Sequence, residues 1–201
     1  MPFAGRLYLL FTPGSCRRDP FGTLAAALAG GVDLVQWRSK EPDSEGFRRC
    51  RDVCRKAGVP LLVNDDVMLA CRSRAAGAHV GQGDMPADAA RKLLGTAWLG
   101  VSTHELPQIA AAAAAGADYV GFGPCFPTAT KGYPTGKSAA EIEAAVQAAG
   151  QRQLPLFAIG GIAPDNLLGL RVLGIDRVAV SGAVLQSDDP RGTAAALRRL
   201  L

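Results

Sequence analysis

Three polar side chains occupy alternate positions at the end of an apolar segment. Two of them, Gln36 and Arg38, lie in the β-rich segment 33–38, and Lys40 lies two residues after it. Because alternate residues of a strand share a face, we expect these side chains to point together, while Trp37 packs outward. A guanidinium and an ammonium together suit a polyanion such as a diphosphate, the alternative being ordinary surface charge.

Carboxylates follow the next two β-rich segments. Asn64, Asp65 and Asp66 end one segment, and Asp84 follows the other. Asp65 and Asp84 at neighbouring strand ends are a common arrangement for Mg²⁺, which would also take phosphate oxygens of a substrate. Asn64 could hydrogen-bond a substrate beside them. The alternative is that Asp65 or Asp66 caps the next helix, and with two adjacent aspartates both roles can coexist.

Glycines mark the ends of the last two β-rich segments. Gly160 and Gly161 follow one of them, and Ser181 and Gly182 follow the other. Glycine lets backbone N–H groups approach a phosphate, and a helix N-terminus adds partial positive charge. These residues therefore favour a monophosphate site over ordinary tight turns.

A long loop follows the segment 119–122. It spans residues 123–132 and carries the hydroxyls of Thr128 and Thr130 and the ammonium of Lys131, so it is a candidate lid. Cys125 in this loop has no obvious base partner, and a catalytic thiol is not expected there.

The chain has two histidines. His79 lies within a β-rich segment, where a packed side chain is the expectation. His104 follows another such segment and is a minor candidate for proton transfer.

Composition sets the class of protein. The chain has 201 residues, 48% of them hydrophobic and 20% charged, which excludes a disordered or collagen-like chain. The net charge of +4 suits a small anionic substrate and gives no argument for nucleic acid. No apolar run is long enough for a bilayer, and no signal peptide is recognisable, so we expect a cytoplasmic protein with free thiols and no membrane partner.

Short β-rich segments alternate with segments of helical periodicity. The predicted strands are 6–11, 33–38, 60–64, 77–81, 97–101, 119–122, 156–159 and 177–180. The predicted helices include 22–29, 44–57, 87–94, 106–115, 139–149, 163–173 and 190–201. The expected helix start signals are Asp43 with Ser44, Thr103 and Ser138.

A glycine recurs where a predicted helix leads into the next strand, at Gly31, Gly77, Gly116 and Gly174. This repetition predicts an α/β protein with a closed (β/α)8 TIM barrel, whose active site lies at the C-terminal strand ends. An open dinucleotide-binding sheet would need G-x-G-x-x-G after the first strand, and residues 12–15 do not supply it. No linker divides the chain, so residues 1–201 are predicted to form a single TIM-barrel domain.

Taken together, these residues resemble the thiamine phosphate synthase family, with its thiazole tautomerase branch as a close relative. The resemblance runs in order through most of the chain. Its segments are Gln36-x-Arg38-x-Lys40, Asn64-Asp65, Gly81-Gln82-x-Asp84, Gly100-Val101-Ser102-x-His104, Gly121-x-Gly123-Pro124-x-Phe126-Pro127-Thr128-x-Thr130-Lys131, Ile159-Gly160-Gly161-Ile162 and Val180-Ser181-Gly182. The family is a (β/α)8 barrel, in agreement with the pattern of strands and helices.

The resemblance implies a transferase. It condenses a 4-amino-2-methylpyrimidine methyl diphosphate with a thiazole phosphate, giving thiamine monophosphate and pyrophosphate through a dissociative pyrimidine cation. It also implies roles for residues: Gln36, Arg38, Lys40, Asn64, Ser102 and Lys131 for the pyrimidine diphosphate, Asp65 and Asp84 for Mg²⁺, and Thr128, Thr130, Gly161, Ser181 and Gly182 for the thiazole phosphate. Arg38, Lys40, Ser102 and Lys131 are the expected catalytic residues. Trp37, Ser39 and Ala129 complete the predicted substrate-binding set.

Two other functions stay open at this point. A thiazole tautomerase would use His104 for proton transfer and would need no metal, whereas this chain retains Arg38, Lys40, Asp65 and Asp84. A non-catalytic phosphate-binding barrel would bind without turnover. The sequence does not decide whether the protein is a homo-oligomer.

Overall fold

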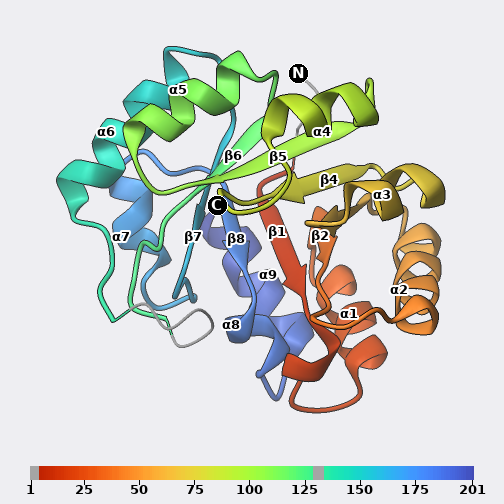
Figure 1. Cartoon of the computed structure of the whole chain (residues 1–201). Helices are drawn as coiled ribbons and strands as arrows, with labels where there is room; N and C mark the ends of the chain where they lie inside the picture. Colours follow the sequence, from red (N-terminus) through yellow and green to blue (C-terminus); the bar gives the residue numbers. More distant parts are fainter. Residues whose placement is uncertain (1–4, 129–133) are drawn as a thin grey trace.

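The computed structural model describes residues 5–128 and 134–201. Their strands form a closed parallel barrel in which each strand pairs with the next and β8 pairs back with β1. Figure 1 shows β1 and β8, from the two ends of the chain, side by side, with helices around the outside. The architecture is the predicted (β/α)8 TIM barrel.

The strands are short and almost entirely buried. They are β1 (Leu7–Phe11), β2 (Leu34–Trp37), β3 (Leu61–Asn64), β4 (Gly77–Val80), β5 (Trp98–Thr103), β6 (Tyr119–Phe122), β7 (Leu156–Ile159) and β8 (Val178–Val180). In β1, Tyr8 and Leu10 point into the barrel, whereas Leu7, Leu9 and Phe11 pack against the helices. Both faces of each strand are covered, which explains the continuous apolar runs in the sequence.

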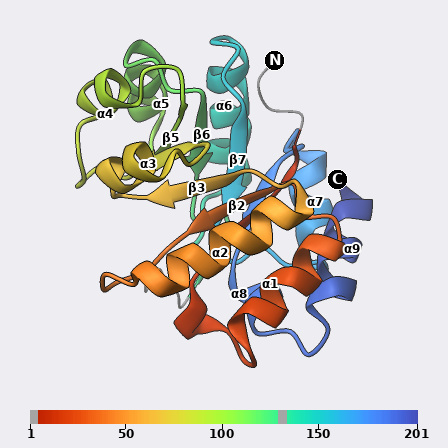
Figure 2. The ribbon, with the colours of Figure 1, turned by 90° about the vertical axis from the view of Figure 1, so that its right-hand side faces the viewer.

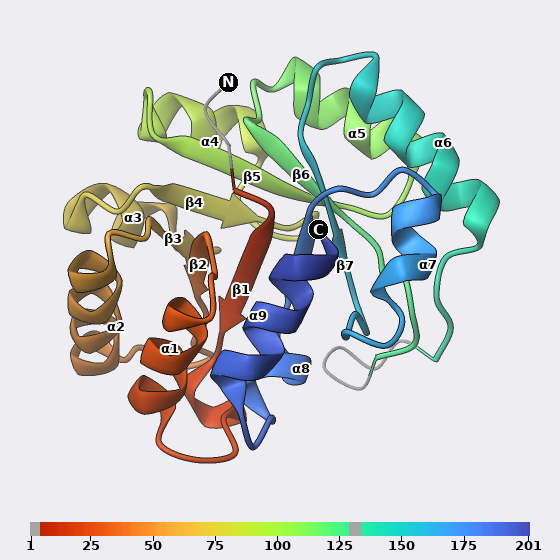
Figure 3. The ribbon, with the colours of Figure 1, turned by 180° about the vertical axis from the view of Figure 1, so that it is seen from behind.

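Helices pack outside the strands and cover the outer apolar layer. They are the 3₁₀ turn η1 (Pro13–Ser15), α1 (Pro20–Ala29), α2 (Ser44–Ala57), α3 (Val67–Ser73), α4 (Ala87–Leu94), α5 (Leu106–Ala114), α6 (Ala139–Gly150), α7 (Leu167–Val172), α8 (Gly182–Leu185) and α9 (Pro190–Leu200). Figure 2 shows α1 and α2 side by side on the outer face, and Figure 3 shows α9 beside α1. Among the described residues, no helix is long and apolar enough to cross a membrane.

Local signals set the helix starts, with one correction. Asp43 caps α2, and Ser138 caps α6 in a reciprocal capping box with Glu141. Thr103, an expected cap, is instead the last residue of β5, and its hydroxyl donates to the carbonyl oxygen of Gly121. The N-cap position lies two residues later, at Glu105, and α5 begins with Leu106 and Pro107.

The glycines after the helices have the expected role, again with one correction. Gly31, Gly116 and Gly174 adopt positive φ angles of 100°, 80° and 86°. Gly77 does not close a helix; it begins β4, where an added Cβ would lie 1.9 Å from the carbonyl oxygen of Trp98. Arg74, with a φ of 53°, ends α3 in its place.

Candidate active site

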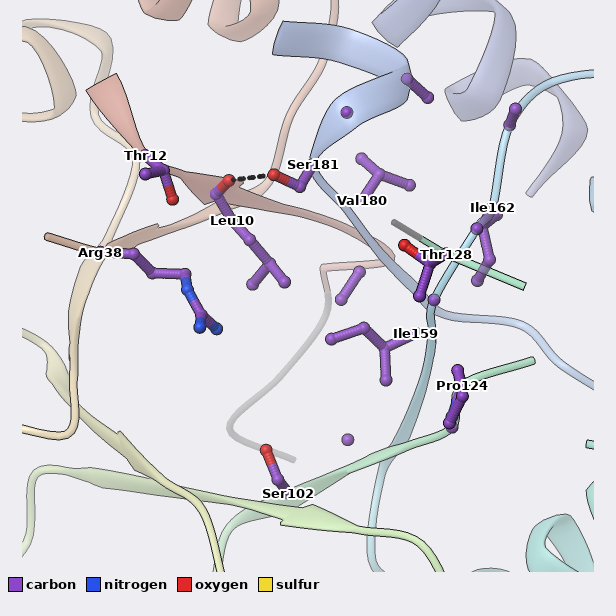
Figure 4. Close-up of a pocket in the computed structure, with 18 of the residues that line it drawn as sticks. Leu10, Thr12, Arg38, Ser102, Pro124, Thr128, Ile159, Ile162, Val180 and Ser181 are labelled. Atoms are coloured by element: carbon purple, nitrogen blue, oxygen red, sulfur yellow. Dashed lines mark hydrogen bonds between the residues drawn. The ribbon is translucent and has the colours of Figure 1, made fainter. Parts of the chain in front are cut away.

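A cavity of about 250 Å³ opens at the mouth of the barrel, at the C-terminal ends of the strands. Its floor is apolar and includes the side chains of Leu10, Ile159 and Ala179, of which Leu10 and Ile159 are labelled in Figure 4. Arg38 and Ser102 face this cavity from different walls. Among the described residues that line it there is no acidic side chain, so the cavity suits an anion with an apolar ring.

Six of the predicted substrate-binding residues come together at this cavity. They are brought there from the loops or strand ends after β2, β5, β6, β7 and β8, and they are Arg38, Ser102, Thr128, Gly161, Ser181 and Gly182. Ala129, Thr130 and Lys131 lie outside the described residues.

Backbone groups dominate the wall after β7 and β8. Gly160 and Gly161 have φ angles of 98° and 65°, and an added Cβ at Gly161 would lie 2.6 Å from the carbonyl oxygen of Pro127. This turn therefore requires glycine. The N–H groups of Gly182 and Ala183 begin α8, where helix geometry offers them no acceptor within the helix. This wall can accept a phosphate through backbone donors.

Ser181 has a structural contact in addition to its place in the cavity. Its hydroxyl donates a 3.0 Å hydrogen bond to the carbonyl oxygen of Leu10, shown as the dashed line in Figure 4. The hydroxyl proton is thus used within the protein. A phosphate contact at Ser181 would rely on its backbone N–H.

Only part of the predicted Gln36, Arg38 and Lys40 triplet faces the mouth. Gln36 is buried inside the barrel below the cavity, in a small void of about 20 Å³ that it shares with Arg38 and Ser102. Because β2 ends at Trp37, Arg38 is the last residue bonded to the neighbouring strand, through its N–H to Phe11. The strand alternation therefore stops before Lys40, contrary to the expectation. Lys40 is exposed and is not among the residues lining the cavity.

Trp37 and Ser39 also point away from the cavity. The indole of Trp37 is buried between the barrel and α2, with ring centroids 6.1 Å from Phe11 and 6.0 Å from Phe47. This is the outward packing expected from strand alternation, and it removes the Trp37 side chain from the substrate set. Ser39 is exposed and donates its hydroxyl to the carbonyl oxygen of Glu41 at 2.6 Å.

The predicted carboxylates stand at the ends of the paired strands β3 and β4. Asp66 caps α3 by accepting from the N–H of Leu69 at 2.7 Å, which leaves Asp65 for another role. Asp65 has a left-handed φ of 63° and accepts from the side-chain amide of Asn64 at 2.5 Å. Asp84 accepts from the N–H of Gly81 at 2.7 Å. Within the part of the chain that the structure describes, no group of three or more His, Cys, Asp and Glu side chains forms a metal cluster.

A chain of buried polar side chains lies beneath the cavity, and sequence reasoning missed most of it. The Nε2 atom of His79 lies 2.8 Å from Oγ of Ser102, and its Nδ1 atom lies 3.0 Å from the hydroxyl of Tyr119. The Tyr119 hydroxyl lies 2.9 Å from that of Tyr8, which accepts a 2.8 Å hydrogen bond from Gln36. His79 is buried, as expected, but both ring nitrogens are hydrogen-bonded. The available signal was the presence of tyrosines at inward positions of apolar strands.

His104 lines the cavity at the end of β5. Its Nδ1 atom lies 2.7 Å from the carbonyl oxygen of Gly123, an atom that can only accept. The ring nitrogen must therefore carry a proton, which orients the imidazole on the loop after β6. This contact gives His104 a structural role at the cavity rim.

Cys125 is buried in the loop after β6, and its thiol donates to the carbonyl oxygen of Phe122. Burial raises the pKa of the Cys125 thiol to about 12, so the thiol stays protonated near neutral pH. This agrees with the expectation that it is not a nucleophile. Sequence reasoning did not identify Thr12 and Pro124, which also line the cavity.

Comparison with known proteins identifies the family to which the chain is similar. A family model described as thiamine monophosphate synthase matches residues 7–184. A thiamine-phosphate synthase of Bacillus velezensis is 37% identical over 199 residues, covering 94% of this chain and 87% of the relative. One from Prochlorococcus marinus (strain MIT 9303) is 43% identical over 188 residues, and there the chain spans only 52% of the relative's length. A solved thiamine phosphate pyrophosphorylase from Pyrococcus furiosus superimposes with a TM-score of 0.86 at 27% identity, covering 97% of this chain and 94% of that one.

Proposed function

The chain belongs to the thiamine monophosphate synthase family, and we infer that it is a thiamine-phosphate synthase. As such it is a transferase that joins a pyrimidine methyl diphosphate to a thiazole phosphate and releases pyrophosphate. The observation that carries this inference is the composition of one cavity. Arg38 and Ser102, expected at the pyrimidine diphosphate, share that cavity with Gly161 and Gly182, expected at the thiazole phosphate.

The apolar part of the cavity supports this assignment. The side chains of Leu10, Ile159 and Ala179 lie between the two polar walls and offer a surface for flat heterocycles. Two substrates bound to one cavity bring their reacting atoms together, which lowers the entropic part of the barrier.

We propose that Asp65 and Asp84 hold Mg²⁺. The donor set fits this ion, because carboxylate oxygens are hard ligands and Mg²⁺ binds through one or two carboxylates with phosphate and water completing its shell. Each carboxylate has one oxygen in a hydrogen bond to its own loop, to Asn64 in one case and Gly81 in the other, which orients it. When bound, the ion would supply positive charge beside the leaving diphosphate.

The reaction we propose breaks the carbon–oxygen bond between the pyrimidine methylene and the diphosphate. The bonding electron pair leaves with the diphosphate, and a pyrimidine methyl cation remains. The thiazole nitrogen then donates its lone pair to the methylene carbon, which forms the new bond. Negative charge grows on the diphosphate as the first bond breaks, so fixed positive charge beside it stabilises the transition state.

Residues of this chain have separate tasks in that reaction. The guanidinium of Arg38 faces the cavity, and we propose that it binds the departing diphosphate with the assistance of Lys40 and Lys131. We propose that Ser102, which also faces the cavity, orients the pyrimidine substrate. The backbone at Gly161 and Gly182, with Thr128, holds the thiazole phosphate so that the ring nitrogen approaches the methylene. The cytoplasmic location and a homo-oligomeric state stay predictions.

The direct test is pyrophosphate release from the pyrimidine methyl diphosphate. Release that requires the thiazole phosphate and Mg²⁺, is abolished by EDTA, and matches the thiamine phosphate formed would establish the synthase. No release in the presence of both substrates and Mg²⁺, with thiazole phosphate still bound, would contradict it.

A further inference from the structure

Two residues of the cavity, Arg38 and Ser102, are joined by a continuous hydrogen-bond chain through the barrel interior. We propose that this chain fixes the direction of the Ser102 hydroxyl, so that Ser102 donates its proton to the substrate and cannot serve as the acceptor. Tyr8, Tyr119 and His79 are then positioning residues for substrate binding. The identity of the substrate rests on the proposed function, but the direction of the chain does not.

The chain crosses the barrel below the cavity and uses side chains from five strands or strand ends. Its successive contacts measure 3.4, 2.8, 2.9, 3.0 and 2.8 Å. In order, they join Arg38, Gln36, Tyr8, Tyr119, His79 and Ser102.

Arg38 sets the direction at one end. A guanidinium has only donors, so the Gln36 atom that faces it must be the carbonyl oxygen, Oε1. The Gln36 amide is thereby oriented with its Nε2 donors toward the hydroxyl of Tyr8. The opposite orientation of the Gln36 amide would place its protons against those of the Arg38 guanidinium, so that two sets of donors would face each other.

The two tyrosines pass the direction on. Both are buried, and burial raises the pKa of each phenol well above its ordinary value, so each hydroxyl keeps its single proton. The Gln36 amide already supplies the proton between it and Tyr8, so the Tyr8 proton is directed to the hydroxyl oxygen of Tyr119, which faces it at 2.9 Å. The Tyr119 proton is in turn directed to Nδ1 of His79, which faces it at 3.0 Å and can accept it.

His79 makes the last link of the hydrogen-bond chain. Its Nδ1 atom accepts from Tyr119, so a neutral imidazole carries its proton on Nε2. That proton is donated to Oγ of Ser102. The hydroxyl of Ser102 thus already accepts one hydrogen bond, and its own proton is directed to a group in the cavity.

The direction of the Ser102 hydroxyl restricts which substrate atom it can bind. The substrate atom that meets Ser102 must be an acceptor, such as a phosphate oxygen or a ring nitrogen with a lone pair. An amino group at that position would face the hydroxyl proton with its own protons. The chain would therefore select the orientation in which the pyrimidine diphosphate enters the cavity.

The direction can be measured on the protein without substrate. The protein has two histidines, so labelling histidine with ¹⁵N gives two imidazoles whose tautomers are resolved by long-range ¹H–¹⁵N spectra. We expect the Nε2–H tautomer for His79 and a protonated Nδ1 for His104, which faces the carbonyl oxygen of Gly123. A Nδ1–H tautomer, a mixture of tautomers or a doubly protonated ring at His79 would overturn the proposal.

Kinetics then test whether the chain acts through Ser102. Tyr8→Phe and Tyr119→Phe each remove one oxygen and keep the packed ring. Each is expected to lower kcat/KM for the pyrimidine diphosphate about threefold to tenfold, the effect of one neutral hydrogen bond. In a Ser102→Ala background the same substitutions are expected to change kcat/KM by less than about twofold, because coupled residues are not additive.

The matched control is Thr193→Val. It removes one hydroxyl from a 2.8 Å hydroxyl pair with Ser187, outside the cavity, and is expected to leave kcat/KM unchanged. Equal losses from Tyr8→Phe with and without Ser102 would assign the tyrosines a purely structural role and overturn the proposal. If the wild-type protein shows no synthase activity, the proposed function fails, whereas the tautomer of His79 still decides the direction of the chain.

Discussion

The hydroxyl of Ser181 donates a 3.0 Å hydrogen bond to the carbonyl oxygen of Leu10, 171 positions away in the sequence. The contact joins the loop after β8 to β1 at the mouth of the barrel, beside the backbone donors of Gly182 and Ala183. The phosphate wall is therefore held in place by a contact made beside the pairing of β1 with β8 that closes the barrel.

Replacing Ser181 by alanine removes this link. We expect Ser181→Ala to raise KM for the thiazole phosphate about threefold to tenfold, because one neutral hydrogen bond that orders the loop is lost. KM for the pyrimidine diphosphate should change little. Steady-state kinetics with each substrate varied in turn would check this, and an equal effect on both substrates would contradict the assignment of Ser181 to the thiazole side.

Gly182 offers a second test of the phosphate wall. An added Cβ there meets no protein atom within 4 Å, so Gly182→Ala should fold normally but place a methyl group at the cavity wall. We expect a rise in KM for the thiazole phosphate of at least about tenfold, since contacts in a well-ordered site are sensitive to small displacements.

Gly169 provides the matched control for that experiment. It lies in α7, outside the cavity lining, and an added Cβ there also meets nothing within 4 Å. Gly169→Ala should keep wild-type kinetics and gain up to about 1 kcal/mol in unfolding free energy from helix propensity. Similar kinetics for the two variants would show that Gly182 is not near the phosphate.

Variants of Asp65 and Asp66 distinguish metal binding from helix capping. Asp65→Asn is expected to reduce Mg²⁺-dependent turnover at least about a hundredfold, because several kcal/mol of charge stabilisation are lost. Asparagine tolerates the left-handed φ of 63°, so the fold should be retained. Asp66→Asn keeps the cap on the N–H of Leu69 and should retain activity. Mg²⁺ titrations of both variants distinguish these roles, and an active Asp65→Asn variant would remove Asp65 from the metal site.

A substitution of His104 distinguishes a synthase from a tautomerase. His104→Ala should retain synthase activity within about tenfold and lose about 1 kcal/mol of stability, because the carbonyl oxygen of Gly123 loses its partner. A loss of at least about a hundredfold, in the range that general acid–base residues supply, would favour proton transfer by His104. Turnover and urea unfolding measured on the same variant check both expectations.

Glu141, at the start of α6, should make the free energy of unfolding depend on pH in the acid range. The N–H of Ser138 hydrogen-bonds Glu141, whose side chain also contacts Lys137 and the Ser138 hydroxyl, and these contacts lower the pKa of Glu141 to about 2 from its ordinary value of 4.5. Because the folded pKa is the lower one, the stabilising effect is complete above about pH 4.5 and is lost as the pH falls toward 2.

The corresponding variant is Glu141→Gln. The difference in unfolding free energy between wild type and variant should be constant above pH 4.5 and shrink between pH 4.5 and 2, as measured by urea unfolding at several pH values. Glu143→Gln removes one carboxylate from the same helix without altering the capping box and is the control. The same pH dependence in both variants would contradict the role of Glu141.

Much of the fold could be predicted from local patterns. The continuous apolar runs gave all the strands, and Asp43 and Ser138 gave two helix starts, because burial of both strand faces and capping act over a few residues. Thr103 was misassigned as a cap because a hydroxyl before an apolar run is equally compatible with the end of a strand. Its partner, the carbonyl oxygen of Gly121, belongs to another strand.

The site, like the fold, was predictable from the sequence in part only. Residue types and their order along the chain determined which groups stand at the strand ends, and thereby the barrel and its family. Only the tertiary structure decided that β2 ends before Lys40, that Ser181 bonds Leu10, and that His79 connects Tyr119 to Ser102. The physical reason is that strand ends, loop paths and hydrogen-bond partners depend on atoms from distant parts of the chain, which the closed barrel brings within about 3 Å.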